Sequence, residues 1–166
     1  MTTVYFFHGA FSSPKSVKIG RLKTIAESLG FTTIIPDHSA IREPDKRVAD
    51  MLKREPDESC LLVGSSMGGY VATVLSTSYK PHGLFLMAPA VFMPATTYEQ
   101  QNLTPSADHI EIVHGWHDAI IPVENSITFA RQHNATLHLV NGEHNLRANL
   151  DTVADLFTLF LAKFNN

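Results

Sequence analysis

Short apolar runs alternate along the chain with longer stretches in which apolar residues recur every three or four positions. A short apolar run bounded by turn-forming residues is typical of a buried strand, whereas the longer spacing is typical of a helix with one buried face. The pattern therefore predicts six strands. They are Val4–Phe7, Thr32–Ile35, Cys60–Val63, Gly83–Met87, Ile110–Val113 and Leu137–Val140.

Five helices are predicted from the longer stretches. In the first, we expect Ser13 to be the N-cap, Pro14 to occupy the first helical position and Gly30 to end the helix. The other four are 44–54, Met67–Tyr79, a helix that Pro122 opens, and a last helix within 151–164. In the charged helix 44–54, the expected buried stripe is Val48, Met51 and Leu52. In the last helix, the expected inward face is Val153, Leu156, Phe157, Phe160 and Phe164.

Strands that alternate with helices are typical of parallel β-α-β crossovers, in which helices cover both faces of a sheet. The predicted fold class is therefore α/β, with a mostly parallel six-stranded sheet. No internal repeat, low-complexity tract or linker interrupts the pattern, so residues 1–166 are predicted to form one domain. The one long stretch without periodicity is 88–108, and a loop of that length is more often functional than idle.

Composition limits the classes of function. The 166 residues are 44% apolar and 17% charged with a net charge of −3, as expected of a soluble globular protein. No basic run is present, so nucleic acid is not an expected partner. The first residues lack the basic segment and long apolar run of a signal peptide or membrane span, which favours a cytoplasmic location without membrane contact. The single cysteine, Cys60, begins a predicted strand and is interpreted as a buried apolar residue.

A Gly-x-Ser-x-Gly motif, residues 64–68, falls where the third predicted strand meets the third predicted helix. A nucleophile elbow requires this context, because a serine on a tight strand-to-helix turn needs glycines beside it for close approach. Ser66 is therefore the predicted nucleophile. The free N–H of Met67 at the start of the helix is a predicted oxyanion donor, and Ala10, after the first strand, is expected to supply a second.

A serine hydroxyl is a poor nucleophile without a base, and a neutral imidazole needs an acid to orient it. Residues just past the carboxyl ends of parallel strands converge on one crevice. Asp118 follows the fifth predicted strand and His144 follows the sixth. The chain order Ser66, Asp118, His144 is that of the hydrolase elbow fold, so these residues form the predicted catalytic triad.

Four stretches carry a resemblance to known proteins: HGAFSSPKS (8–16), GSSMGGYVA (64–72), HGWHDAIIP (114–122) and NGEHNL (141–146). They resemble the motifs of the α/β-hydrolase superfamily, most closely its small lidless bacterial esterases of the YqiA type. The superfamily's usual first two antiparallel strands and its cap domain have no counterpart in this chain. The resemblance implies a reduced α/β-hydrolase fold and hydrolysis of carboxylic esters or thioesters, and it leaves the acyl group open.

Some candidate residues allow a second interpretation. Asp118 could cap the helix at Pro122, alone or in addition to a catalytic role. His8 could serve as a base, although the resemblance implies a structural role for it. His114, His117 and Asp118 could hold a metal, but neither a cysteine nor a third histidine with ligand spacing supports zinc, so no metal is predicted.

The predicted substrate pocket consists of Phe11, Phe92, Met93 and Trp116. Trp116 could instead cover the end of the sheet, and the apolar residues of 92–98 could instead pack among themselves. Because no cap is present, the crevice above Ser66 is expected to be shallow and to suit small acyl groups.

These observations predict a serine hydrolase that cleaves small-molecule carboxylic esters or thioesters through an acyl-enzyme, with no cofactor. The alternative is a catalytically silent binding module with the same fold. Such modules usually lack a triad member, and this chain has all three. A peptidase or a C–C bond hydrolase would need more elaborate pocket walls than the 88–108 loop supplies. The oligomeric state is left open.

Overall fold

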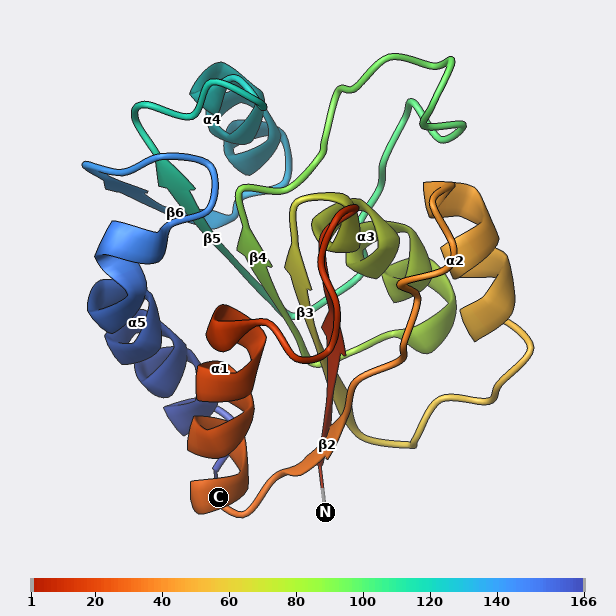
Figure 1. Ribbon diagram of the computed structural model, residues 1–166. Helices are drawn as coiled ribbons and strands as arrows, with labels where there is room; N and C mark the ends of the chain where they lie inside the picture. Colours follow the sequence, from red (N-terminus) through yellow and green to blue (C-terminus); the bar gives the residue numbers. More distant parts are fainter. Residues whose placement is uncertain (1, 166) are drawn as a thin grey trace.

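Among the described residues, six strands form one sheet in the order β2-β1-β3-β4-β5-β6, and every neighbouring pair is parallel (Figure 1). The computed structural model describes residues 2–165. The strands are β1 (Thr3–Phe7), β2 (Thr32–Ile34), β3 (Cys60–Ser65), β4 (Gly83–Met87), β5 (His109–Gly115) and β6 (Thr136–Val140). The predicted fold class is confirmed, and the sheet is entirely rather than mostly parallel.

The first strand, β1, lies inside the sheet, between β2 and β3. From β1 the chain moves outward to β2, and then returns to begin β3 on the other side of β1. A reversal of strand order in a parallel sheet opens a crevice beyond the carboxyl ends of the two strands at the switch point. The residues that follow β1 and β3 therefore flank the expected ligand site.

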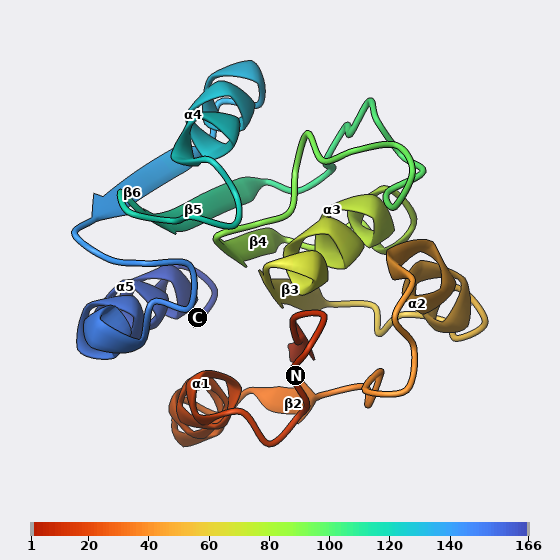
Figure 2. The same ribbon diagram turned by 45° about the horizontal axis from the view of Figure 1, so that its top comes forward.

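Helices cover both faces of the sheet. Helices α1 (Val17–Ser28) and α5 (Leu150–Ala162) lie on one face, and α2 (Pro44–Met51), α3 (Met67–Tyr79) and α4 (Val123–Gln132) lie on the other (Figures 1 and 2). A single 3-10 turn, η1 (Arg147–Asn149), precedes α5. Strand side chains alternate between the two cores: in β1, Tyr5 and Phe7 face α2 and α3, whereas Val4 and Phe6 face α1 and α5.

Helix α1 begins later than the sequence suggested. Its N-cap is Ser16, whose hydroxyl accepts the N–H of Ile19 at 3.3 Å. The predicted N-cap, Ser13, instead starts a turn in which its carbonyl accepts the N–H of Ser16 at 3.1 Å. The Ser13 prediction was therefore wrong, because a second serine with the same capping chemistry lies three residues further on.

Helix α2 is shorter than predicted and buries a different stripe. Val48 and Met51 are buried as expected, but the helix ends at Met51, and the side chain of Leu52 is 51% exposed. The buried face of α2 instead includes Arg47, which is 1% exposed. Cys60, the first residue of β3, is buried as expected, and burial raises the pKa of its thiol to about 11.

The long loop 88–108 contains no helix or strand, and it is fastened to the helices below it. The ring of Tyr98 packs edge-on against Tyr70 of α3, with ring centroids 4.9 Å apart. The carboxylate of Asp45 in α2 accepts both the hydroxyl of Tyr70 at 2.7 Å and the N–H of Glu99 at 3.0 Å. The loop therefore has a defined position beside the sheet edge without any regular structure of its own.

His8, at the end of β1, is a buried structural residue. Its Nδ1–H donates to the carbonyl of Gly9 at 2.9 Å, and its Nε2 accepts the N–H of His38 at 3.2 Å. Both ring nitrogens are thus engaged by the backbone in a neutral tautomer. Burial lowers the pKa of both His8 and His38, the latter against the opposing effect of the hydrogen bond that His38 donates to Asp50.

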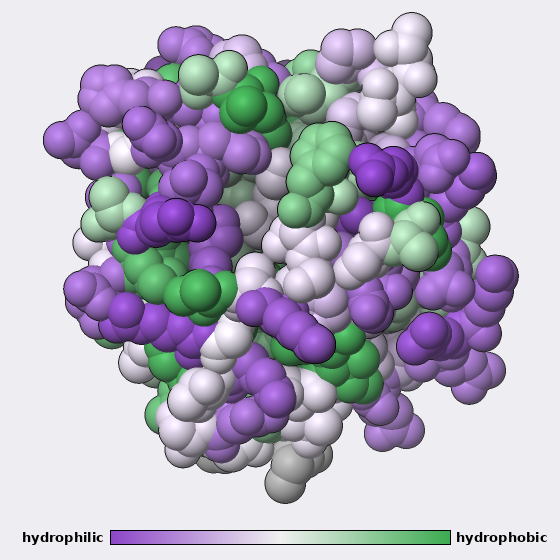
Figure 3. Space-filling model, in the orientation of Figure 1, coloured by the Kyte–Doolittle hydropathy of each residue, from purple (hydrophilic) through white to green (hydrophobic). Residues whose placement is uncertain are grey.

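The face shown in Figure 3 presents hydrophobic side chains in small groups separated by hydrophilic ones. Among the helices of residues 2–165, none combines the length and apolar character that crossing a membrane requires.

We expect the free energy of unfolding to fall as the pH is lowered from about 7.5 to about 5. The folded pKa values of His8 and His38 lie below the ordinary value near 6.5 that the unfolded chain has. The unfolded chain therefore binds more protons below about pH 6.5, so stability is complete above that pH and is lost as the pH falls toward the folded pKa values. Urea titrations at several pH values, followed by circular dichroism, measure this slope.

The matched variants are His8→Gln, which removes a buried histidine, and His82→Gln, which removes an exposed one. The pH slope should be shallower in His8→Gln and retained in His82→Gln. Equal slopes in the wild type and His8→Gln would contradict the role assigned to burial.

Candidate active site

The chain makes a strained turn at Ser66, between β3 and α3. Ser66 has φ 56° and ψ −120°, a conformation that residues with a side chain rarely adopt. A Cβ on Gly64 would lie 2.3 Å from the carbonyl oxygen of Gly68, and one on Gly68 would lie 2.0 Å from the carbonyl oxygen of Phe7. Both glycines of the motif are therefore needed for close backbone approach, and Gly68 also brings α3 against the end of β1.

The three residues predicted as a triad lie in one hydrogen-bonded line. Ser66 Oγ is 2.9 Å from Nε2 of His144, and Nδ1 of His144 is 2.7 Å from Oδ2 of Asp118. They follow β3, β6 and β5 respectively, at one edge of the sheet. In this geometry the imidazole can accept the serine proton at Nε2 while the carboxylate holds Nδ1–H.

The side chain of Asp118 is fully buried and accepts four hydrogen bonds. Oδ1 accepts the N–H groups of Ile120 and Ile121, both at 2.8 Å, and Oδ2 accepts from His144 and from His114. Burial acts to raise the pKa of Asp118. The hydrogen bonds from Ile121, His144 and Ile120 outweigh burial and hold the pKa below its usual value, so the carboxylate is ionised at neutral pH.

The alternative role of Asp118 as a helix cap takes a different form from the one expected. Helix α4 begins at Val123, with Pro122 in the N-cap position and no side-chain cap. Asp118 instead binds backbone N–H groups of the loop before the helix, which fixes its carboxylate toward His144.

His114 is a part of the site that the sequence did not reveal. It is fully buried; its Nδ1 accepts the hydroxyl of Ser126 at 2.7 Å, and its Nε2–H donates to Oδ2 of Asp118 at 2.9 Å. Burial is the main cause that lowers the pKa of His114, so the ring is neutral. The sequence signal for this role is the position of His114, four residues before Asp118 at the end of a strand. Within residues 2–165, no three His, Cys, Asp or Glu side chains are arranged to hold a metal ion.

The loop after β1 is held from below by Arg47 of α2. The guanidinium donates to the carbonyls of His8 at 2.8 Å, Gly9 at 3.3 Å and Ala10 at 3.4 Å, and its Nε–H donates to the carbonyl of Ile41 at 2.8 Å. Because a trans peptide directs its N–H opposite to its C=O, a Gly9 carbonyl that faces Arg47 turns the N–H of Ala10 away from Arg47. No sequence pattern indicates this role, because Arg47 lies in a helix rich in charged residues.

Both predicted oxyanion donors lie beside Ser66. Ala10 and Met67 line the same cavity as Ser66 and His144. A Cβ on Gly9 would lie 3.6 Å from Cβ of Ser66, so the loop backbone is in contact with the serine. Within residues 2–165, no protein acceptor takes the N–H of Ala10 or Met67, and both are free to donate to a ligand.

The cavity above Ser66 has a volume of about 1080 Å³. Its walls are the loop 9–16 with the first turn of α1, residues 93–98, Ile120 with Ile121, and residues 144–150. This volume is at the upper end for small-molecule sites in proteins. The site is therefore larger than the expected small crevice: the loops around the carboxyl edge of the sheet form a wide, partly open cavity without a cap domain.

Two of the four predicted pocket residues, Phe11 and Met93, line this cavity, and Phe92 does not. The ring of Phe92 packs edge-on against Phe129 of α4, with ring centroids 6.2 Å apart. Its φ of 54° sends the side chain away from Met93, its neighbour in the chain. Of the apolar residues in 92–98, Met93 and Tyr98 line the cavity, so this segment serves both as pocket wall and as internal packing.

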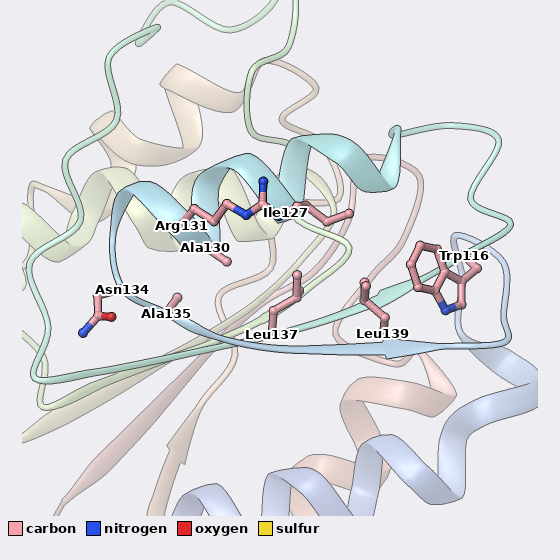
Figure 4. A pocket seen from close by; sticks show the side chains of 8 residues that line it. All are labelled: Trp116, Ile127, Ala130, Arg131, Asn134, Ala135, Leu137 and Leu139. Carbon is pink, nitrogen blue, oxygen red and sulfur yellow. The ribbon is translucent and has the colours of Figure 1, made fainter.

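The fourth predicted pocket residue, Trp116, lies elsewhere. The N–H of Trp116 donates to the carbonyl of Val140 at 2.9 Å, which extends the pairing of β5 with β6. Its side chain lines a separate hollow between α4 and β6, together with Arg131, Leu137 and Leu139 (Figure 4). Trp116 therefore lies outside the cavity above Ser66, where it was predicted to lie, because the pairing of the segment after β5 with β6 directs its ring toward α4.

The sequence of residues 3–103 matches the sequence model of the family described as "Uncharacterised protein family (UPF0227)", over more than half of the chain. The chain belongs to the UPF0227 family. No significant match was found among curated protein sequences.

Comparison with solved structures places this UPF0227 protein in a superfamily. A protein of the alpha/beta hydrolase superfamily from Xanthomonas campestris pv. campestris is 28% identical, covers 98% of both chains and superimposes with a TM-score of 0.84. The ydeN gene product of B. subtilis is 20% identical over 98% of this chain and 100% of its own, with a TM-score of 0.80. A lidless a/b serine hydrolase from Xanthomonas campestris is 16% identical over 99% and 82%, with a TM-score of 0.74. The UPF0227 protein therefore has the α/β-hydrolase fold without a lid.

We expect the free energy of unfolding of Ser66→Gly to be about 1 kcal/mol higher than that of Ser66→Ala. Both variants lose the hydroxyl, but only glycine relieves the backbone strain at φ 56°. The greater freedom of glycine in the unfolded chain offsets part of this gain in stability. Urea denaturation of the two variants measures the difference.

The control is the same pair of substitutions at Ser78, an exposed residue within α3, where glycine should be the less stable variant by about 1 kcal/mol. A Ser66→Gly variant that is less stable than Ser66→Ala would show that the turn carries no strain.

Proposed function

We propose that this UPF0227 protein is a serine hydrolase that cleaves carboxylic esters or thioesters through an acyl-enzyme. One observation carries the proposal. The line from Ser66 Oγ to His144 Nε2 (2.9 Å) and from His144 Nδ1 to Asp118 (2.7 Å) opens into a cavity that two free backbone amides also reach. This set supplies the nucleophile, the base, the orienting acid and the oxyanion donors that acyl transfer requires.

The reaction follows from these positions. Ser66 Oγ attacks the carbonyl carbon of the bound ester, and His144 takes the hydroxyl proton at Nε2. The negative charge that develops on the carbonyl oxygen is stabilised by the N–H groups of Ala10 and Met67. His144 then gives its proton to the departing alcohol or thiol, which leaves the acyl group on Ser66. A water molecule, deprotonated by His144, releases the acid and restores the serine.

Asp118 has two effects on His144. Its carboxylate fixes the ring in the tautomer that leaves Nε2 free to accept a proton, and its charge stabilises the imidazolium that forms during attack. Its ionised state is favoured by the lowered pKa, and its full burial prevents water from weakening the interaction.

A catalytically silent binding module is the alternative function. Such a module would have no use for a serine held in a strained conformation or for a buried carboxylate with four donors. These features stabilise charge separation rather than the fold, and they favour an enzyme. The acyl group has more room than expected, since the cavity volume of about 1080 Å³ accommodates more than a short acyl chain.

We expect a fluorophosphonate probe to label the wild-type protein at Ser66, and peptide mass mapping locates the label. Ser66→Ala should lose both the label and the hydrolysis of p-nitrophenyl butyrate while its circular dichroism spectrum stays the same. Ser65→Ala is the matched control, because Ser65 precedes Ser66 and is the last residue of β3. Labelling at another residue, or hydrolysis by Ser66→Ala at the wild-type rate, would exclude the proposed mechanism.

We expect Asp118→Asn to lower kcat by on the order of 10⁴-fold, because an amide at this position stabilises the wrong tautomer of the base. Glu143→Gln is the control: Glu143 is exposed and adjoins His144 in the chain, yet its side chain contacts no member of the triad. Its kcat should stay within about twofold of the wild type, as is usual for an exposed substitution. Loss of activity in Glu143→Gln together with a mild effect of Asp118→Asn would identify a different acid.

A further inference from the structure

The cavity above Ser66 has a charge that is opposite to that of the whole chain. The chain carries 16 acidic and 13 basic side chains. The cavity lining nevertheless includes four cations and no aspartate or glutamate. The four cations are Lys15, Lys18, Arg42 and Arg147. An enclosed surface lined by one sign of charge concentrates ligands of the opposite sign.

None of these four cations has a carboxylate within 4.0 Å in the part of the chain that the structure describes. Six other basic residues of the chain do have such a partner, namely Arg21, Lys23, Lys46, Lys53, Arg54 and Lys163. The cations of the cavity therefore take no part in the ion pairs that neutralise other basic side chains of the surface.

Lys18 is the cation that lies next to the triad. Its Nζ donates to the carbonyl of Asn145 at 3.2 Å, and Asn145 directly follows His144. Burial lowers the pKa of the Lys18 ammonium to about 8, against the opposing attraction of the Asp118 carboxylate. A partly desolvated ammonium without an ionic partner is costly to the folded protein, and an anion beside it would offset that cost.

The stability of helix α1 does not explain these lysines. Lys15 and Lys18 flank the N-terminus of α1, whose first turn holds no acidic residue. Cations at this end of a helix are disfavoured by the helix dipole. The guanidinium of Arg42 lies 5.7 Å from the ring centroid of Phe11, so a cation and an exposed aromatic ring lie together in the lining of the cavity.

The remaining lining is largely apolar and includes Ile19, Met93, Tyr98, Ile121, Leu146 and Leu150. We propose that the preferred substrate of this site is an ester or thioester that carries an anionic group, a carboxylate or a phosphate, bound by Lys18 with Arg147, Lys15 and Arg42 around it. The proposal rests on the proposed function of the site, and it names the class of substrate.

Two esters with the same four-methylene acyl chain test the proposal. Mono-p-nitrophenyl adipate has a free carboxylate, and methyl p-nitrophenyl adipate has a neutral methyl ester in its place. We expect the wild-type protein to favour the anionic ester by at least about tenfold in kcat/KM, because a hydrogen bond to a charged group is stronger than one to a neutral group. The preference should shrink as sodium chloride is added. p-Nitrophenyl 5-phosphonopentanoate replaces the carboxylate by a phosphonate, and its kcat/KM relative to the adipate distinguishes a carboxylate site from a phosphate site.

The variant Lys18→Met should reduce the ratio of the two kcat/KM values by at least about fivefold, since it removes the charge and keeps the length of the side chain. If the substitution also disturbs His144 and thereby changes the hydrolysis of both esters by the same factor, that factor cancels in the ratio. Lys23→Met is the control, because Lys23 lies in the same helix but outside the cavity. The same ratio of kcat/KM values is measured for Arg42→Gln and Arg147→Gln. Both residues are exposed, so these substitutions should leave folding intact.

Binding to Ser66→Ala, measured by calorimetry, separates the two proposals. Tighter binding of the anionic ester that depends on Lys18 supports the anion site whether or not hydrolysis is observed. Hydrolysis of both esters at equal rates, or a ratio that Lys18→Met leaves unchanged, overturns the anion site and leaves the serine hydrolase standing. Absence of hydrolysis and of fluorophosphonate labelling in the wild type overturns the hydrolase instead.

Discussion

The close approach of helix α3 to the end of β1 is the constraint on which the site depends. No side chain fits at Gly68, because a Cβ there would lie 2.0 Å from the carbonyl oxygen of Phe7. This contact places the first turn of α3 beside the loop that leaves β1, although the two segments are about 60 residues apart in the chain. Ser66, the proposed nucleophile, and Ala10 and Met67, the proposed oxyanion donors, are therefore held beside one another by one contact between backbones.

Arg47 completes this arrangement from the opposite side. Its guanidinium donates hydrogen bonds to four backbone carbonyls, three in the loop after β1 and that of Ile41. Burying a cation costs free energy, and the four hydrogen bonds to carbonyls offset that cost for Arg47 without a carboxylate. Because the loop carbonyls face Arg47, the loop amides are oriented before any substrate arrives. Donors that need no reorganisation during the reaction are the main source of electrostatic stabilisation in acyl transfer.

Much of this architecture could be predicted from the sequence, because its signals are local. The strands and the elbow at Ser66 follow from short patterns, and Asp118 and His144 follow from their places after successive strands. The parts that could not be predicted depend on which faces meet in three dimensions. Arg47 lies among other charged residues, and nothing local distinguishes the one that is buried.

The direction in which a side chain points at the end of a strand could not be predicted from the sequence either. Trp116 and Phe92 lie close in the chain to cavity residues, but the pairing of β5 with β6 and a positive φ turn them elsewhere. The lining of the cavity comes from six separate segments and its four cations from three of them, so the cavity exists only in the folded protein.

The all-parallel sheet has a consequence for how the protein folds. No pair of its strands can form as a local hairpin, so each pairing must first close a loop that spans a whole crossover. The bond from Ser66 to His144 spans 78 residues, among the longest separations in the chain. Proteins dominated by such non-local contacts fold slowly. During synthesis from the N-terminus, residues 60–68 are made before β6, so Ser66 is present in the growing chain before His144, its proposed base, has been added.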